Sequence, residues 1–291
     1  MKGIILAGGL ATRLHPSSLT INKHLLPVYD KPMIYHPLST LVLAGIKDIL
    51  IITSKEFVDD FRALLGDGSR LGISISYEIQ DKPNGIGEAF LIGEKFIDNQ
   101  PVCLILGDNI FHGTDLKSKF KNAISNNSTT KGATIFAYKV LDPRQYGVVE
   151  FNEEGIAVSI EEKPSKPKSN FAIPGLYFYD QNIVDIAKNM KPSDRNELEI
   201  TDINNFYLSK KTLKVIELGR GTAWFDCGTE DSLLSASNFV QIIEQKQGFK
   251  IGCIEEVALN EGLLKKSDLI KFLSNKNSKY YDYIKSILEF K

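Results

Sequence analysis

The sequence predicts an α/β fold: a Rossmann-like core whose mainly parallel, mixed sheet is flanked by helices, followed by a β-rich part and a C-terminal helical appendage. Short apolar runs alternate with helix-length amphipathic stretches through the first half of the chain, which is the pattern of βαβ units. From about residue 146 the pattern changes to that of a β-hairpin, and the chain ends in segments with helical spacing.

The first half contains the predicted core strands. An apolar run at residues 3–6 opens the chain, and further runs follow at 49–52, 102–106 and 133–138. Such alternation implies helices on both faces of the sheet and ligands in the crevice at the carboxyl ends of the strands. The first run is short and is closed at once by glycines and an arginine, so we interpret it as a core strand and not as a signal peptide.

The second half predicts a hairpin and several helices. Residues 146–151 and 157–160 alternate as two strands around a turn at 152–155 (NEEG). The segments with helical spacing are 182–190, 200–208 and 232–245, with two further short helices within 261–290.

Composition excludes several classes of protein. The 291 residues are 43% hydrophobic and 24% charged, which is enough apolar material for a sizeable core. The 35 basic and 36 acidic side chains give a net charge of −1, so no electrostatic footprint for nucleic acid or a membrane surface exists. Cys103, Cys227 and Cys253 have no paired spacing, which disfavours disulfides and zinc and indicates a cytoplasmic protein.

The first predicted strand runs into a glycine turn at residues 8–13 (GGLATR). Gly8 and Gly9 lack a Cβ, so several backbone N–H groups can converge on anionic oxygens, while Arg13 supplies charge and a planar fork of donors. We expect Lys23 to join them. The turn lacks both the Walker pattern and the third glycine of a dinucleotide fingerprint. It predicts polyphosphate binding, although a plain strand-to-helix turn with a solvated arginine would look the same in isolation.

Further motifs follow in order at residues 23–35 (KHLLPVYDKPMIY), 106–109 (LGDN), 161–164 (EEKP), 175–179 (GLYFY), 197–202 (ELEITD) and 224–229 (WFDCGT). Together with the glycine turn they closely resemble the glucose-1-phosphate thymidylyltransferases, a family of sugar nucleotidyltransferases. The resemblance covers nearly the whole chain and thins after about Glu261. Separated motifs in one order are far more specific than any of them alone.

The resemblance implies a cytoplasmic, homotetrameric enzyme that makes dTDP-glucose and pyrophosphate from dTTP and glucose 1-phosphate, the first step of dTDP-rhamnose or related dTDP-sugar synthesis. It implies a nucleotidyltransferase core at 1–240, with a nucleotide-binding part at about 1–140 and a sugar-binding part at about 141–230, and a helical appendage at 241–291. Two alternatives stay open. One is the same chemistry with UTP or another hexose 1-phosphate, and the other is a catalytically silent sugar-nucleotide-binding regulatory protein.

The reaction implies a divalent metal. A phosphate oxygen attacks the α-phosphorus of a triphosphate, so two anionic groups must be positioned and their charge neutralised. Two carboxylates suffice for Mg²⁺, which keeps waters and shares ligands with phosphates. Asp108 and Asp226 match the aspartates that hold Mg²⁺ in the resembled family, although a lone aspartate after a strand is often only a turn or a helix cap.

Basic and polar residues complete the predicted site. Lys163 and Arg195 are expected to clamp the sugar phosphate, although most Lys and Arg side chains are solvated surface cations. The predicted catalytic residues are Arg13, Lys23, Asp108, Lys163, Arg195 and Asp226. The predicted nucleotide-binding residues are Leu6, Gly8, Gly9, Thr12, Arg13, Lys23, Gln80, Gly85 and Asp108. The predicted sugar-phosphate-binding residues are Asn109, Gly147, Glu162, Lys163, Tyr177 and Arg195.

The chain departs from the family pattern at a few positions. The family usually reads thymine with a glutamine ahead of a Pro-Asp-Gly-Leu-Ala-Gln helix start, whereas here Gln80 precedes residues 81–89 (DKPNGIGEA), with Glu88 where glutamine is usual. The Gln80 amide carries a donor and an acceptor, so it can pair with a pyrimidine edge. Ala11 replaces the usual glycine, a conservative change if its φ is negative. We expect Trp224 to pack and not to bind.

Overall fold

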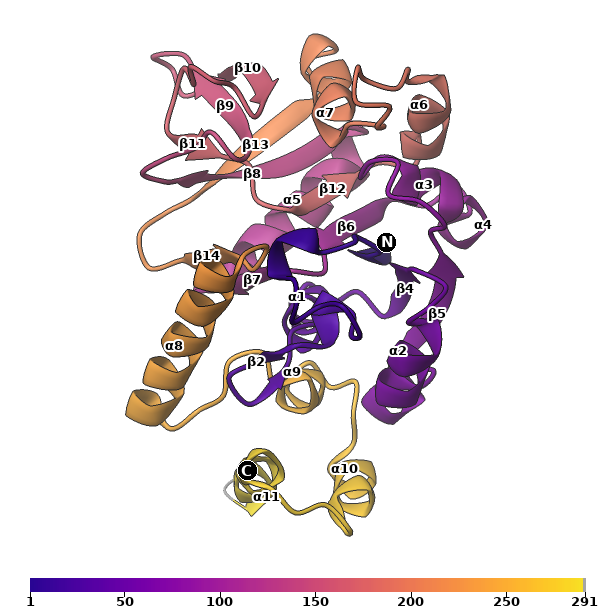
Figure 1. Ribbon diagram of the computed structural model, residues 1–291, viewed down its shortest axis with the longest axis vertical. Helices are drawn as coiled ribbons and strands as arrows, with labels where there is room; N and C mark the ends of the chain where they lie inside the picture. Colours follow the sequence, from indigo (N-terminus) through magenta and orange to yellow (C-terminus); the bar gives the residue numbers. More distant parts are fainter. Residues whose placement is uncertain (290–291) are drawn as a thin grey trace.

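A ten-stranded mixed sheet forms the centre of the computed structural model, which describes residues 1–289 without the side chains of residues 128–130 (Figure 1). Its strands lie in the order β10-β9-β11-β8-β12-β6-β1-β4-β5, with β13 paired to β8. The strands of this sheet are β1 (Lys2–Ala7), β4 (Asp48–Thr53), β5 (Ser74–Ile79), β6 (Val102–Leu106), β8 (Ala133–Lys139), β9 (Gly147–Phe151), β10 (Ala157–Glu162), β11 (Phe171–Ala172), β12 (Leu176–Tyr179) and β13 (Leu213–Leu218).

The parallel part of this sheet positions the glycine turn. Strands β6, β1, β4 and β5 run parallel, with Ile5 opposite Ile51 on one side and Ile105 on the other. Because β1, β4 and β6 are almost fully buried, their apolar runs in the sequence are continuous and not alternating, whereas β5 lies at the edge of the sheet and is largely exposed. Their carboxyl ends bring the segments after Ala7, Ile79 and Leu106 to one edge, as the sequence predicts.

Antiparallel pairing extends the sheet into the second half of the chain. Strand β12 pairs antiparallel with both β6 and β8, and β9 forms the predicted hairpin with β10. The predicted α/β class and its mainly parallel, mixed sheet are therefore confirmed. One continuous sheet carries both halves, as Figure 1 shows from β5 to β10.

Helices cover both faces of the sheet. Helix α1 packs against β6 and α9, α3 packs against α6, and α7 packs against β10. The helices expected near residues 182, 200 and 232 are present as α6, α7 and α8, and the two expected after residue 261 are present as α10 and α11, but α9 was missed. The helices are α1 (Tyr35–Leu43), α2 (Val58–Leu65), α3 (Glu88–Ile92), α4 (Glu94–Ile97), α5 (Leu116–Thr130), α6 (Ile183–Asn189), α7 (Ile200–Ser209), α8 (Glu230–Gln247), α9 (Ile254–Asn260), α10 (Lys266–Leu273) and α11 (Lys279–Glu289).

Short elements shape the edge of the sheet. Strands β7 (Asn109–His112) and β14 (Ala223–Asp226) form an antiparallel pair, and β2 (Pro27–Val28) pairs with β3 (Lys31–Pro32). Two of the 3₁₀ helices, η1 (Thr12–Leu14) and η2 (Lys23–Leu25), follow β1, while η3 (Ser69–Leu71) precedes β5.

The two faces of the sheet form two hydrophobic cores. Ile4 and Ile5 are adjacent in β1 but belong to different cores, because successive side chains of a strand point to opposite faces. In one core the rings of Phe120 and Phe136 pack edge to face, with their centroids 6.0 Å apart. In the other core Phe90 and Tyr179 pack in the same way, with their ring centroids 5.3 Å apart. Among the described helices, none combines the length and the apolar run that a membrane span requires.

A buried ion network joins helix α8 and the segment that follows it to the β2–β3 hairpin. The Lys31 ammonium lies 2.5 Å from Asp30 and 2.9 Å from Glu244 of α8, and Lys250 contacts the same two carboxylates. Helix α8 continues without a break past residue 240, where the appendage was expected to begin. Figure 1 shows α10 and α11 at the end of the molecule farthest from β10.

Candidate active site

The two aspartates predicted to bind metal are brought together by short strands. Asp108 lies between the end of β6 at Leu106 and the start of β7. Strand β14 pairs with β7 so that Asp226 lies opposite Asn109, and the Cys227 N–H donates to the Asp108 carbonyl over 2.9 Å. Two carboxylates that are far apart in the sequence therefore meet at one edge of the sheet.

Different surroundings shift the pKa values of these carboxyl groups in opposite directions. Burial opposes ionisation of Asp108, but the Lys23 ammonium against its Oδ2 and a 3.0 Å hydrogen bond from Asn109 Nδ2 to its Oδ1 hold its pKa well below the usual range. Burial and the nearby Asp108 charge raise the pKa of Asp226 to about 6. Asp108 is thus already paired with a cation, while the negative charge of Asp226 is only partly compensated.

Glycine is required at the turn between β6 and Asp108. A Cβ on Gly107 would lie 2.6 Å from the His24 ring, and the Gly107 N–H donates to the Leu6 carbonyl over 2.9 Å. Burial lowers the pKa of His24 to about 3, so its ring is neutral. Its Nδ1 lies 2.6 Å from Asn22 Oδ1. This packing places Leu6, a predicted nucleotide-binding residue, directly beside the Asp108 turn.

Asn109 connects the carboxylate pair to the wall of a cavity. Besides donating to Asp108, it accepts hydrogen bonds at Oδ1 from the Trp224 Nε1–H at 2.7 Å and from the Gly175 N–H at 2.9 Å. The Trp224 ring packs edge-on against Tyr138 and Tyr146, as expected, but its indole N–H also orients Asn109. Nothing in the sequence signals this contact, because the two residues meet only when β14 pairs with β7.

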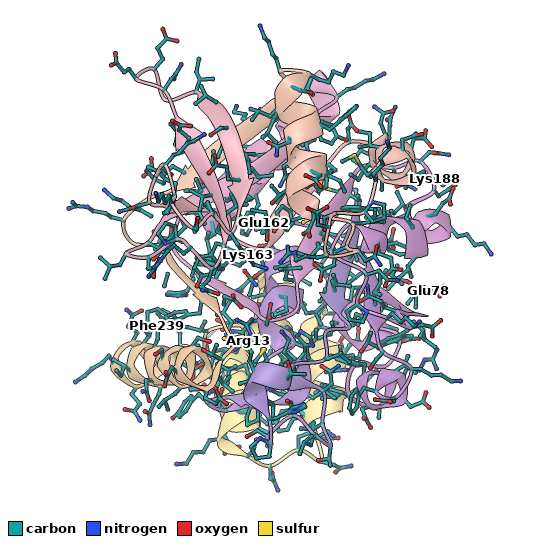
Figure 2. The ribbon with its side chains drawn as sticks, turned by 45° about the horizontal axis from the view of Figure 1, so that its top comes forward. Arg13, Glu78, Glu162, Lys163, Lys188 and Phe239 are labelled. Atoms are coloured by element: carbon teal, nitrogen blue, oxygen red, sulfur yellow. The ribbon has the colours of Figure 1, made fainter. Side chains whose placement is uncertain are left out.

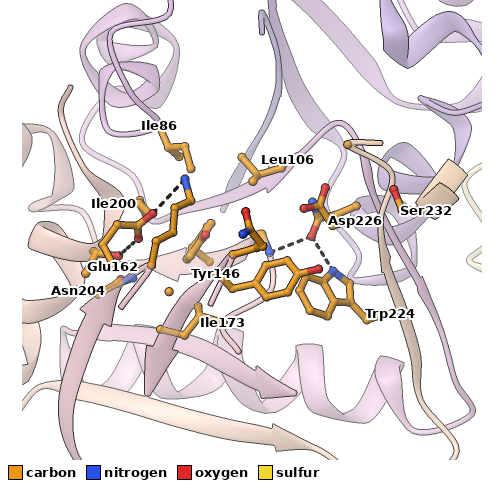
Figure 3. Close-up of a pocket in the computed structure, with 18 of the residues that line it drawn as sticks. Ile86, Leu106, Tyr146, Glu162, Ile173, Ile200, Asn204, Trp224, Asp226 and Ser232 are labelled. Carbon is orange, nitrogen blue, oxygen red and sulfur yellow. Dashed lines mark hydrogen bonds and ion pairs between the residues drawn. The ribbon is translucent and has the colours of Figure 1, made fainter. Parts of the chain in front are cut away.

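A cavity of about 470 Å³ opens beside Asp226. Figure 3 shows Glu162 at one end of this first cavity, Asp226 and Trp224 at the other, and Tyr146 between the two ends. Convergent polar groups on aromatic and aliphatic walls suit a small polar ligand such as a sugar. The predicted site residues that line the first cavity are Arg13, Asn109, Gly147, Glu162, Lys163, Tyr177 and Asp226.

Glu162 and Lys163 follow one another at the end of β10. Thr201 Oγ1 donates to Glu162 Oε2 over 2.5 Å, and Lys163 Nζ lies 3.4 Å from Glu162 Oε1. Gly147 of β9 is the residue paired with Glu162 in the antiparallel β9–β10 ladder. Figure 2 shows Glu162, Lys163 and Arg13 near one another in the centre of the view. Thr201, which the sequence analysis missed, orients the carboxylate predicted to bind sugar hydroxyls.

Arg195 lies beside the first cavity without lining it. Its guanidinium donates to Glu199 Oε1 over 2.8 and 3.2 Å, and it approaches Glu162 Oε1 at 3.8 Å. Its side chain is 47% exposed. The structure therefore brings Lys163 into the cavity wall and leaves Arg195 next to Glu162 on the solvent side.

A second cavity of about 440 Å³ lies at the glycine turn. Thr12 lines this second cavity and Arg13 lines the first, so η1 separates the two. Ser54 and Lys55, which follow β4, add a hydroxyl and an ammonium to its wall. The predicted nucleotide-binding residues that line the second cavity are Gly8, Gly9, Thr12 and Lys23.

The conformation of Ala11 corrects one expectation. Its φ is 51° and its ψ is 34°, which is the left-handed region, so replacing glycine by alanine here is not conservative. A residue with a Cβ pays about 1–2 kcal/mol for this conformation. The Ser18 hydroxyl donates to the Ala11 carbonyl over 2.8 Å and helps to hold the turn.

Gln80 lies against the glycine turn. It follows β5 directly, its backbone N–H donates to the Thr53 carbonyl over 2.8 Å, and only 4% of its surface is exposed. Its side-chain oxygen occupies the space that a Cβ on Gly8 would fill, at 2.5 Å. Gly85 has a φ of 100°, and a Cβ on it would lie 2.6 Å from backbone atoms of Leu198, so glycine is required there. The predicted base-reading segment is thus held between the glycine turn and residue 198.

Comparisons with known proteins show the family of the chain. The sequence model of the nucleotidyl transferase family matches residues 2–242, so the chain belongs to that family. Within it, the chain groups with the glucose-1-phosphate thymidylyltransferases. It is 56% identical to the one from Neisseria meningitidis over 264 residues, covering 91% of both chains, and 50% identical to the one from Mycobacterium tuberculosis over 290 residues, covering 99% of both.

Solved structures share the fold. A structure described as a glucose-1-phosphate thymidylyltransferase from Bacillus anthracis, in complex with sucrose, has a TM-score of 0.76 and 43% identity, with 82% of this chain and 94% of that chain covered. A UDP-glucose pyrophosphorylase complexed with UDP-glucose has a TM-score of 0.69 and 28% identity, with 83% and 98% covered.

Proposed function

We propose that this enzyme forms dTDP-glucose and pyrophosphate from dTTP and glucose 1-phosphate, by direct attack of the sugar phosphate on the α-phosphorus of dTTP. The observation that carries the proposal is the arrangement of two polar cavities on either side of η1, next to a pair of carboxylates. Relatives at about 50% identity over nearly the full chain bear the name of this activity.

In this proposal the second cavity receives the triphosphate. Backbone N–H groups at Gly8 and Gly9 and the Lys23 ammonium face anionic oxygens there. Arg13, from the wall between the cavities, neutralises charge that develops as pyrophosphate leaves. Lys23 contacts both the triphosphate and the carboxylate pair, because its ammonium pairs with Asp108 and also lines the second cavity.

The first cavity receives glucose 1-phosphate. Lys163 holds its phosphate, Arg195 adds a second positive charge from the solvent side, and Glu162 accepts hydrogen bonds from ring hydroxyls. The Thr201 hydroxyl keeps the Glu162 carboxylate in place. Because the nucleophile is itself an ionised phosphate, no protein group has to remove a proton from it.

Asp108 and Asp226 are suited to hold Mg²⁺. Among the described residues no group of three or more His, Cys, Asp or Glu could hold a metal by itself, so the ion must take ligands from substrate and water, as Mg²⁺ does. The partly compensated charge of Asp226 supports this role. When bound, the ion would bring the two anionic substrates together and shield the charge between them.

A matrix of nucleoside triphosphates against hexose 1-phosphates, read by pyrophosphate release, tests the proposal. The expected best pair is dTTP with glucose 1-phosphate. UTP is the serious competitor, since a UDP-glucose pyrophosphorylase shares the fold. Higher efficiency with UTP would replace the thymidylyltransferase assignment, and no pyrophosphate from any pair would leave a silent binding protein.

Two further features belong to this proposal. We place the enzyme at the first step of dTDP-rhamnose or a related dTDP-sugar pathway. We also place it in the cytoplasm, and the three buried free cysteines support this location.

We also propose a homotetramer. The apolar side chains of Leu234 and Ile242 on α8 are 60% and 55% exposed, and this exposure supports a contact with another subunit. Light scattering of the purified protein tests the number of subunits.

A further inference from the structure

The Gln80 amide is tied to a carboxylate. Its Nε2 donates to Glu88 Oε2 over 2.7 Å, and Asn84 Nδ2 donates to Glu88 Oε1 over 2.8 Å. Glu88 is the first residue of α3, and the preceding Gly87 is fixed by a 2.8 Å hydrogen bond from its N–H to the Leu198 carbonyl. Glu88 thus holds Gln80 from an anchored helix start.

A carboxylate determines which way an amide points. A free Gln side chain can rotate so that its oxygen and nitrogen exchange places, and either orientation can satisfy a neutral neighbour. An ionised carboxylate only accepts hydrogen bonds, so the Gln80 NH₂ must face Glu88. The Gln80 oxygen is then directed to the glycine turn, where it lies against Gly8. Among the described residues, no hydrogen bond to this oxygen occupies it.

We propose that Glu88 is a positioning residue that sets base specificity, by presenting the Gln80 side-chain oxygen, and not its NH₂, to the base. The inference rests on the proposed function and on the prediction from the sequence that Gln80 pairs with the pyrimidine edge of the base. Thymine and uracil carry an N–H at ring position 3 and donate to such an acceptor. Cytosine has an unprotonated nitrogen at that position, so two acceptors would face each other and one would be left unpaired.

Gln80 and Glu88 line neither cavity themselves, but the segment that carries them runs from one cavity to the other. Asp81, next to Gln80, lines the second cavity, and Ile86, two positions before Glu88, lines the first. A base held here lies next to the glycine turn that binds the phosphates. The glutamine usual at position 88 in the resembled family can present either an oxygen or an NH₂, whereas the carboxylate of this chain permits one orientation only.

The test compares kcat/KM for dTTP and dCTP, with glucose 1-phosphate saturating. Glu88→Ala frees the amide and is expected to lower the ratio of dTTP to dCTP at least tenfold. Glu88→Lys offers only donors, so it turns the Gln80 NH₂ to the base and lowers the ratio further. Glu94→Ala is the matched control, because Glu94 is a carboxylate on α4 that pairs with Lys188 at the surface. In this variant the ratio of kcat/KM for dTTP to that for dCTP should equal the parent's.

The ratio separates positioning from a structural effect, because loss of fold lowers both efficiencies together. If both Glu88 variants fold, as shown by their melting curves, and keep the parent's ratio while Gln80→Ala lowers it, the role of Glu88 is refuted and base reading by Gln80 stands. If Gln80→Ala also keeps the ratio, base reading at this segment is refuted, and the inference fails with it.

Discussion

Lowering the pH from 7 to 5 is expected to weaken divalent-metal binding about tenfold, through Asp226 alone. Burial and the Asp108 charge raise the pKa of Asp226 to about 6, so protons compete with the metal below that pH. With this pKa about nine-tenths of the group is ionised at pH 7 and about one-tenth at pH 5, and each unit below the pKa costs about 1.4 kcal/mol of apparent binding free energy.

The neighbours of Asp226 do not add to this pH dependence. Lys23 keeps the pKa of Asp108 well below its usual range, so Asp108 stays ionised throughout, and His24, with a pKa lowered by burial to about 3, stays neutral. Titration of Mn²⁺, with free Mn²⁺ followed by electron paramagnetic resonance, measures the affinity at each pH. The Asp226→Asn variant should bind Mn²⁺ weakly, and with the same affinity at pH 5 and pH 7. A parent affinity that does not change with pH, or the same slope in the variant, would refute the reasoning.

Other predictions concern stability and substrate binding. Ala11→Gly should raise the free energy of unfolding in urea by about 0.5–1 kcal/mol, because relief of the left-handed alanine exceeds the added chain entropy; an unchanged or lower value would contradict this. Glu244→Leu should lower it by about 3–5 kcal/mol, since Lys31 would be left buried without one of its carboxylates, and a loss below 1 kcal/mol would show that the network contributes little. Lys163→Ala should raise the KM for glucose 1-phosphate at least tenfold, with little change in the KM for dTTP. Arg195→Ala should raise the KM for glucose 1-phosphate by a smaller factor, because Arg195 is half exposed and bonded to Glu199. A larger rise in Arg195→Ala than in Lys163→Ala would contradict this order of importance.

The sequence was most informative where one local signal determines the structure. The buried apolar runs of β1, β4, β6 and β8 are unambiguous, since they are short, bounded by polar segments and interleaved with helical spacing. Helix α9 was missed, although α6, which has the same length of seven residues, was predicted from its helical spacing.

Features that depend on distant segments were not predictable in the same way. The bond between Trp224 and Asn109 exists only because β14 pairs with β7, and the clamp of Glu88 on Gln80 only because α3 begins beside β5. Ala11 shows the same limit in one residue, since its left-handed φ is imposed by the turn and not by its own preference. Motif order predicted which residues form the site, and the structure shows which side chains contact them.

Turnover of Asp226→Asn with dTTP, glucose 1-phosphate and Mg²⁺ tests most directly the claim that the carboxylate pair forms the reaction centre. The substitution keeps the shape and removes a charge that burial disfavours, so the melting temperature should be unchanged or higher. The rate of pyrophosphate release should fall at least ~100-fold, as expected when electrostatic stabilisation of the transition state is lost. A folded variant that turns over within a few-fold of the parent would contradict the account.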